Sequence, residues 1–185
     1  MSFNIIGIDP SLAGTGIAFA DGSTATVKEK GYEGDKRLIL IYTSVRAAIK
    51  GADAVVIEDL PANAMSAGIT GRSQGVVRLA LQQLGVPYIA IPPATLKKVA
   101  TGKGNCKKEP MREAMQAHFD EELPTRGPGK VDDNQVDSWY LRQAGLYLFG
   151  MENHVHEAAY EGLEKYQAEA DLIKEVFNEW DGPQG

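Results

Sequence analysis

The sequence contains a single cysteine, few histidines and no long apolar segment. Cys106 has no partner for an internal disulfide, so we expect a protein of a reducing compartment. No apolar run approaches the roughly 20 residues of a membrane-spanning helix, and residues 1–10 lack the basic start of a secretory signal. Repeats and low-complexity tracts are also missing, and 43% hydrophobic residues are typical of a globular chain with its own core. We therefore expect a cytoplasmic protein with no membrane partner.

The net charge of −6 is unevenly distributed along the chain. Residues 151–185 carry nine acids and two bases, so the remaining 150 residues carry 16 acids and 17 bases, a net charge of +1. One segment, residues 94–112, contains a single acid, Glu109, among six bases: Lys97, Lys98, Lys103, Lys107, Lys108 and Arg112. An acidic total therefore does not exclude a nucleic-acid-binding protein, and this basic segment favours a polyanionic partner.

The hydrophobic pattern predicts a β-meander followed by alternating helices and strands. Strands are expected over residues 3–8, 17–20, 24–28, 54–57 and 86–91. Helices are expected over residues 36–50, 74–84 and 133–149, with shorter ones after Pro93 and around Pro110. Residues 60–75, rich in Gly, Ala and Ser, predict a loop. This order indicates an α/β fold with a mixed five-stranded sheet.

The C-terminal segment shows a heptad-like apolar stripe. Its members are Ala159, Leu163, Tyr166, Ala170, Ile173, Phe177 and Trp180. The stripe predicts a long helix, for which packing along the body is favoured over a coiled coil. We therefore divide the chain into a domain over residues 1–150 and an acidic helical extension over residues 151–185.

Two acids directly follow or end the buried strands. Asp9 ends the first apolar run, and Glu58 ends the run over residues 54–57. Acids at the carboxyl ends of two strands in one sheet can lie side by side, where ligands of α/β sheets bind. A lone Asp-Pro is ordinarily a turn, but two adjacent carboxylates repel each other unless a cation joins them.

A third group of acids opens the helix that begins near residue 133. Asp133 and Asp137 are four residues apart and so share one helical face, whereas Asp132 is explained as a helix cap. Oxygen ligands without a nearby histidine favour Mg²⁺ or Mn²⁺ over zinc. Asp9, Glu58, Asp133 and Asp137 could hold two such ions, an arrangement that hydrolyses phosphodiesters.

Four motifs in register resemble the RuvC-type Holliday-junction resolvases. They are IGIDPSLAGTG (6–16), VVIED (55–59), the basic segment PATLKKVATGKGNCKKEPM (93–111) and DNQVDS (133–138). The resemblance spans roughly residues 3–149. It implies an RNase H-like fold, a homodimer and Mg²⁺- or Mn²⁺-dependent nicking of branched DNA, with two ions in each active site.

The resemblance also implies roles for individual residues. Asp9, Glu58 and Asp137 match the catalytic carboxylates, and Lys97 and Lys108 match supporting lysines. We take Lys108 as catalytic. The expected DNA contacts are Lys97, Lys98, Lys103, Lys107 and Arg112.

The sequence departs from the family pattern in three places. Asn134 stands where the bacterial enzymes have an acid, so Asp133 becomes the candidate fourth metal ligand, with Asp132 and Asn134 left open. Residues 60–64 lack the family's aromatic wedge, which predicts looser selectivity extending to forks and flaps. Together with the acidic extension, these departures suggest a bacteriophage version that acts in the host cytoplasm.

Two other functions compete with this hypothesis. Asn134 would also fit a non-catalytic branched-DNA-binding protein with a degraded nuclease site. The opening motif is similar to the phosphate loop of sugar kinases and actin-like ATPases, but those proteins need a second copy of the domain to enclose a nucleotide.

Overall fold

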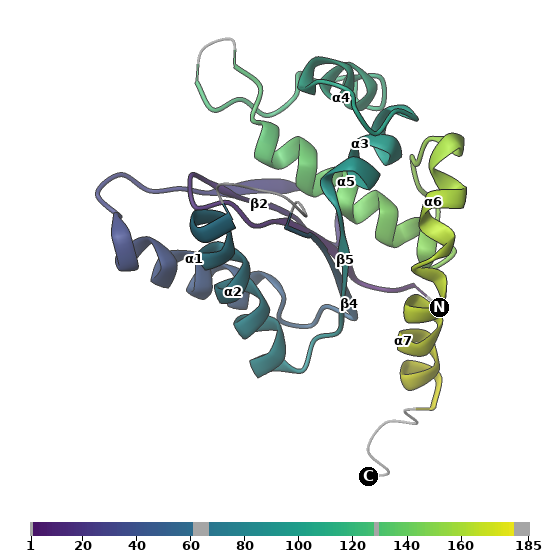
Figure 1. Cartoon of the computed structure of the whole chain (residues 1–185), viewed down its shortest axis with the longest axis horizontal. Helices are drawn as coiled ribbons and strands as arrows, with labels where there is room; N and C mark the ends of the chain where they lie inside the picture. Colours follow the sequence, from purple (N-terminus) through teal and green to yellow (C-terminus); the bar gives the residue numbers. More distant parts are fainter. Residues whose placement is uncertain (1, 61–66, 128–129, 180–185) are drawn as a thin grey trace.

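The fold is built around a mixed sheet of five strands (Figure 1). The computed structural model describes residues 2–60, 67–127 and 130–179. The strands are β1 (Ile5–Asp9), β2 (Thr15–Ala18), β3 (Thr24–Val27), β4 (Ala54–Glu58) and β5 (Tyr88–Ile91). Their order is β3-β2-β1-β4-β5, in which β1 to β3 form an antiparallel meander and β4 and β5 run parallel to β1. The predicted α/β class and mixed sheet are confirmed.

Helices cover both faces of this sheet (Figure 1). One face carries α1 (Gly34–Ala48) and α2 (Ala67–Leu84). The other carries α5 (Asp133–Leu148), with α3 (Pro93–Thr101) and α4 (Lys108–Gln116) beside it. The C-terminal segment contains a 3₁₀ turn, η1 (Glu157–Ala159), and the helices α6 (Tyr160–Glu164) and α7 (Gln167–Glu179).

The prediction of a loop over residues 60–75 is wrong for its second half, because α2 begins at Ala67. Residues 61–66 lie outside the described part of the chain. They include most of residues 60–64, the segment that contains no aromatic wedge. The glycines in this stretch suggested a loop, but tertiary contacts outweigh that weak propensity. The buried Ser73 side chain donates to the Pro10 carbonyl at 3.2 Å, and the buried Gln74 side chain donates to the Glu58 carbonyl.

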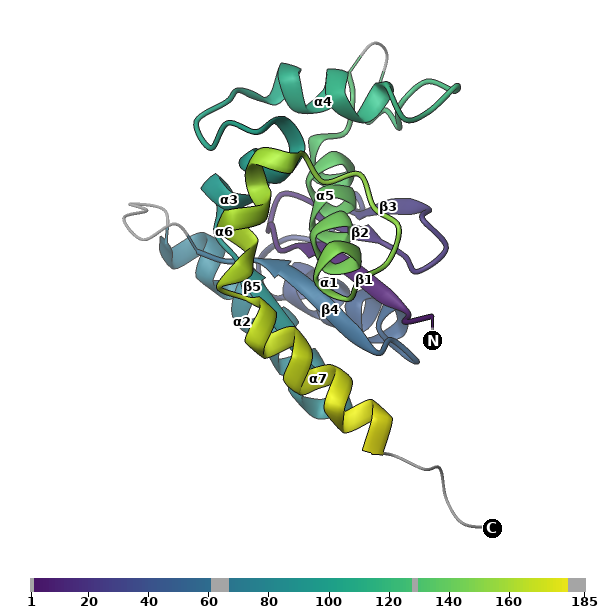
Figure 2. The ribbon, with the colours of Figure 1, turned by 90° about the vertical axis from the view of Figure 1, so that its right-hand side faces the viewer.

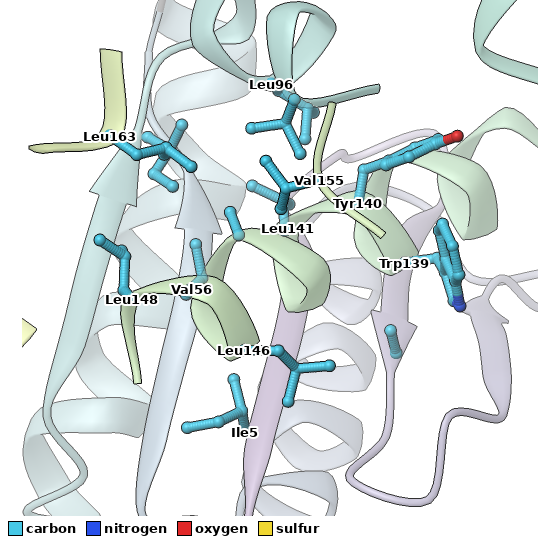
Figure 3. Close-up of a cluster of buried hydrophobic side chains, with 14 of the residues drawn as sticks. Ile5, Val56, Leu96, Trp139, Tyr140, Leu141, Leu146, Leu148, Val155 and Leu163 are labelled. Atoms are coloured by element: carbon cyan, nitrogen blue, oxygen red, sulfur yellow. The ribbon is translucent and has the colours of Figure 1, made fainter. Parts of the chain in front are cut away.

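Alternation along β1 and β4 divides the core into two layers. Ile5 and Val56 face α5, whereas Ile6 and Val55 face α1 and α2. Figure 3 shows Ile5 and Val56 beneath Leu146 and the neighbouring residues of α5. By the same alternation, the last residues of β1 and β4, Asp9 and Glu58, lie on the α5 side of the sheet.

Glycines on β1 and β2 allow α5 to lie directly on the sheet. A Cβ atom added at Gly7 would lie 2.1 Å from the Ser138 carbonyl oxygen, and one added at Gly16 would lie 1.9 Å from that of Asn134. Both distances are far below van der Waals contact, so any side chain there would push the helix away. At Gly16 the backbone that approaches the strand so closely belongs to α5.

The C-terminal segment packs on the α5 side of the sheet instead of standing apart (Figure 2). The described part of the predicted stripe faces the body, since Ala159, Leu163, Ala170 and Ile173 all belong to the same hydrophobic cluster as Ile5, whereas Trp180 lies outside the described residues. The expected single long helix is broken between α6 and α7, where the Gln167 side chain donates to the Leu148 carbonyl at 3.0 Å. That bond fixes the start of α7 against the end of α5.

Phe3 connects the two ends of the described chain. Its ring meets Phe149 edge to face at 5.0 Å and Phe177 of α7 at 6.1 Å between centroids. None of the helices in the described ranges is both long and apolar enough to cross a bilayer.

Candidate active site

Asp9 and Glu58 lie side by side at one edge of the sheet. Each is the last residue of its strand, β1 and β4 are parallel neighbours, and Ile8 pairs with Ile57 in the residue before. Asp9 is only 6% exposed, and Glu58 is partly buried. The predicted meeting of these two acids at the carboxyl ends of the strands is therefore found in the structure.

Helix α5 adds a third carboxylate, Asp137, which is 5% exposed. Its Oδ2 accepts a hydrogen bond from the Lys108 ammonium at the start of α4, and the two charges form an ion pair. Its Oδ1 is buried with no hydrogen-bonding partner in the described structure. An unpartnered buried carboxylate oxygen costs free energy, so this atom is suited to a cation.

Burial and mutual repulsion both favour the protonated forms of these acids. Burial, followed by the charges of Glu58 and Asp137, raises the pKa of Asp9 well above its ordinary value. Burial and the Asp137 charge raise the pKa of Glu58 to about 7. Burial also raises the pKa of Asp137, although the Lys108 ammonium opposes it. The three carboxylates thus share one poorly solvated space.

Two lysines reach this group of acids. Burial alone would lower the pKa of Lys108, but the charges of Asp137, Glu58 and Asp9 raise it above its ordinary value. Lys108 therefore carries a firmly held positive charge. Lys97 on α3 lies near enough for its charge to lower the pKa values of Glu58 and Asp137 in part.

Asp133, the candidate fourth metal ligand, is already paired with an arginine. Arg112 Nε lies 2.7 Å from Asp133 Oδ1 and Arg112 Nη2 lies 2.8 Å from Oδ2, a bidentate pair. Although partial burial opposes it, this pairing lowers the pKa of Asp133. The predicted DNA contact at Arg112 and the predicted ligand at Asp133 are thus each other's partners in the structure.

The other two alternatives for the fourth ligand face elsewhere. Asp132 is the N-cap of α5, as predicted, and its Oδ1 accepts from the Asn134 backbone N–H at 3.1 Å. The Asn134 side chain lies over Gly14, where an added Cβ would be 2.9 Å from its Nδ2.

The remaining predicted DNA contacts lie on α3 and in the loop between α3 and α4. Lys103 and Lys107 are exposed in the loop before α4, and Lys98 is partly exposed on α3. Asp59, the acid next to Glu58, is half-exposed and pairs with Arg78 at 2.9 Å.

One buried residue beside the site was not predicted. Gln74 of α2 donates to the Glu58 carbonyl and so holds the end of β4. A polar residue in a glycine-rich stretch gives no sequence signal for such a role.

The donor set fits a hard divalent cation. Within the described ranges, no three His, Cys, Asp or Glu side chains already stand in a metal-binding arrangement. The oxygens are nonetheless of the type that Mg²⁺ and Mn²⁺ bind, one of them is unpartnered, and their repulsion favours a positive charge between them.

This strand order, with acids ending two parallel strands and a third on the covering helix, defines the RNase H-like class of α/β proteins. Comparison with known proteins found no matching family model. The RuvC crossover junction endodeoxyribonuclease of Chloroflexus aggregans is 31% identical over 124 residues, which cover 60% of this chain and 76% of the relative. The chain belongs to the RuvC family of crossover junction endodeoxyribonucleases.

Further comparisons extend this result over more of the chain. The RuvC endonuclease of Gloeobacter violaceus is 29% identical over 177 residues, which cover 88% of this chain and 95% of the relative. The structure of Thermus thermophilus RuvC superimposes with a TM-score of 0.60 at 21% identity and covers 80% of this chain and 96% of that one. The T. thermophilus protein in complex with a Holliday junction substrate gives a TM-score of 0.58 at 22% identity, over 76% of this chain and 90% of that one. The RNase H-like fold is confirmed.

Proposed function

We propose that this protein is a metal-dependent, structure-selective endonuclease that cuts Holliday junctions. The observation that carries the proposal is the group formed by the buried Asp9 and Asp137 and the partly buried Glu58, three carboxylates with raised pKa values at the carboxyl edge of the sheet. Repulsion among three acids does not stabilise a fold, and carboxylates whose pKa values are shifted in this way are found mainly at functional sites. Family membership supplies the reaction class.

Asp9, Glu58 and Asp137 are the proposed cation ligands, and we propose two Mg²⁺ or Mn²⁺ ions in each site. When bound, the ions would supply Lewis acidity and positive charge to the phosphodiester. The chain's own part is to hold the three carboxylates in place. Asp9 and Glu58 are fixed by the pairing of β1 with β4, and Asp137 is fixed by the glycine-mediated contact of α5 with the sheet.

The lysines supply the complementary charge. The Lys108 ammonium lies on Asp137 and can neutralise negative charge on a phosphate placed beside that residue. Lys97 would supply a second positive charge at the acids. Lys98, Lys103 and Lys107 would hold the DNA backbone through charge alone.

The partners follow from the resemblance and the family. The protein would act as a homodimer on four-way junctions in the cytoplasm, because paired nicks need two active sites. We propose that forks and flaps are also cut, since the sequence over residues 60–64 contains no aromatic wedge.

A cleavage assay tests the proposal. Labelled four-way junction, fork, flap and linear duplex would be incubated with Mg²⁺, Mn²⁺ or EDTA. We expect metal-dependent nicks in the junction that are absent from the linear duplex and from all samples with EDTA. Failure to nick any branched substrate with either metal would overturn the proposal.

A matched pair of variants locates the active site. Asp9→Asn should bind the junction and not cut it, whereas Asp59→Asn, the neighbouring acid that pairs with Arg78, should cut normally. Tight junction binding without cleavage by the wild-type chain would instead identify a non-catalytic branched-DNA-binding protein.

A further inference from the structure

The helices α4 and α5 face each other through two ion pairs in antiparallel register. Lys108 and Arg112 are one turn apart on α4, and Asp137 and Asp133 are one turn apart on α5. Lys108 pairs with Asp137, and Arg112 pairs with Asp133. Since the two spacings match, one docking position of α4 satisfies both pairs at once.

The Arg112–Asp133 pair has the features of a fixed contact. Both oxygens of Asp133 accept from the guanidinium, and the two side chains are only 19% and 27% exposed. Glu109 holds a third nitrogen of Arg112 at 3.1 Å. Bidentate, partly sheltered pairs of this kind restrict geometry far more than exposed ion pairs do.

The start of α4 has no side-chain cap of its own. Its N-cap, Lys107, makes no side-chain capping bond, and the preceding loop passes through Gly102 at φ 74°. Lys108 is the first residue of the helix. The buried Met111 and Met115 hold the apolar side of α4, and the two ion pairs hold its polar side against α5.

We infer that Arg112 and Asp133 form a positioning pair, which docks α4 on α5 and so places the Lys108 ammonium at Asp137. This assigns both residues a different role from the metal ligand and DNA contact expected from the sequence. The inference rests on the proposed function, because the ammonium position matters for catalysis only if Asp137 belongs to the active site.

Three roles are possible for these residues, and each predicts a different result: a positioning pair, a metal ligand at Asp133, or a DNA contact at Arg112. A positioning pair gives Arg112→Gln and Asp133→Asn the same defect, a loss of about tenfold in single-turnover cleavage, as expected when a catalytic group is misplaced. The double variant should be no worse than either single, because the interaction is already lost. Junction affinity and Mg²⁺ affinity should stay within about twofold in all three variants.

Exchange of the two charges supplies a rescue that general destabilisation could not produce. The double variant Arg112→Asp, Asp133→Arg keeps the pair in reverse and should recover most of the cleavage rate. Arg46→Gln on α1 is the matched control, an arginine replaced in the same way on a helix of the opposite face, and it should cleave normally.

The opposing outcomes are equally definite. If Asp133 is a metal ligand, Asp133→Asn weakens Mg²⁺ binding by the DNA-free protein and Arg112→Gln tightens it, because the arginine no longer competes. If Arg112 holds DNA, Arg112→Gln weakens junction binding and Asp133→Asn does not. Either result, or multiplied losses in the double variant, would overturn the inference.

A stability measurement separates this inference from the proposed function. Lys108→Met should change the melting temperature of the wild-type protein and have a much smaller effect in the Arg112→Gln background. That coupling is measured without DNA or metal. A wild-type chain that cuts nothing would refute the proposed function, whereas equal effects of Lys108→Met in both backgrounds would refute the positioning pair.

Discussion

Replacement of Glu58 by glutamine should change how stability depends on pH. The raised pKa of Glu58 means that the folded protein binds this proton more tightly than the unfolded chain does. The resulting stabilisation is complete below pH 4.5, the ordinary value, and is lost as pH rises to about 7. At about 1.4 kcal/mol per pH unit, the loss amounts to about 3 kcal/mol in the metal-free protein.

Thermal unfolding in EDTA between pH 5 and 8 measures this loss. For a chain of this size, about 3 kcal/mol corresponds to a fall of roughly 6–12 °C in melting temperature as pH rises. Glu58→Gln has no titrating carboxyl group at position 58, and its melting temperature should fall clearly less. Mg²⁺ should stabilise the wild-type protein more at pH 8 than at pH 5, because the cation binds the ionised carboxylate.

Asp59→Asn is the control, since that side chain is half-exposed beside Glu58 and faces away from the acids. It should retain the wild-type pH dependence. If Glu58→Gln and the wild-type protein lose the same stability between pH 5 and 8, the electrostatic description of this site is wrong.

Substitutions at four positions test the architecture and the chemistry of the site. Gly16→Ala should cost about 3 kcal/mol in urea unfolding, since its Cβ would lie 1.9 Å from the Asn134 carbonyl oxygen; full stability would contradict the close contact of α5 with β2. Asp132→Ala should cost about 1 kcal/mol through loss of the α5 cap, and Asp132→Asn much less. Leu163→Ala should cost about 3 kcal/mol in the same assay, because this side chain of α6 is fully buried. Lys108→Met should slow single-turnover cleavage about a hundredfold at nearly unchanged junction affinity, and an unaltered rate would exclude Lys108 from the chemistry.

The central acids of the site could be predicted because local patterns determine them. Asp9 and Glu58 end apolar runs of the kind that form buried strands, and parallel strands place their carboxyl ends at one edge. Asp137 shares a face with Asp133 by helical spacing alone. The role of Lys108 came from resemblance, and the structure adds its contact with Asp137.

What the sequence could not provide are contacts that depend on how elements dock. The pairing of Arg112 with Asp133 depends on the position of α4, which the buried Met111 and Met115 help to set. The start of α2 could not be predicted, because its glycines weaken the helical pattern and the helix is anchored by bonds from its own Ser73 and Gln74 to the Pro10 and Glu58 carbonyls of other segments. The role of Gly16 could not be predicted from the sequence, because it depends on the close contact of α5 with β2.

The packing of α6 and α7 on the α5 side of the core has a consequence for synthesis on the ribosome. Phe3 and Ile5 leave the exit tunnel early, yet their partners in this layer include Ala170, Ile173 and Phe177, which are translated much later. Until then the nascent chain exposes apolar surface that the finished protein hides, a state prone to aggregation and to chaperone capture. Ribosomes stalled near residue 150 should therefore carry a protease-sensitive chain, and release of the full length should protect it.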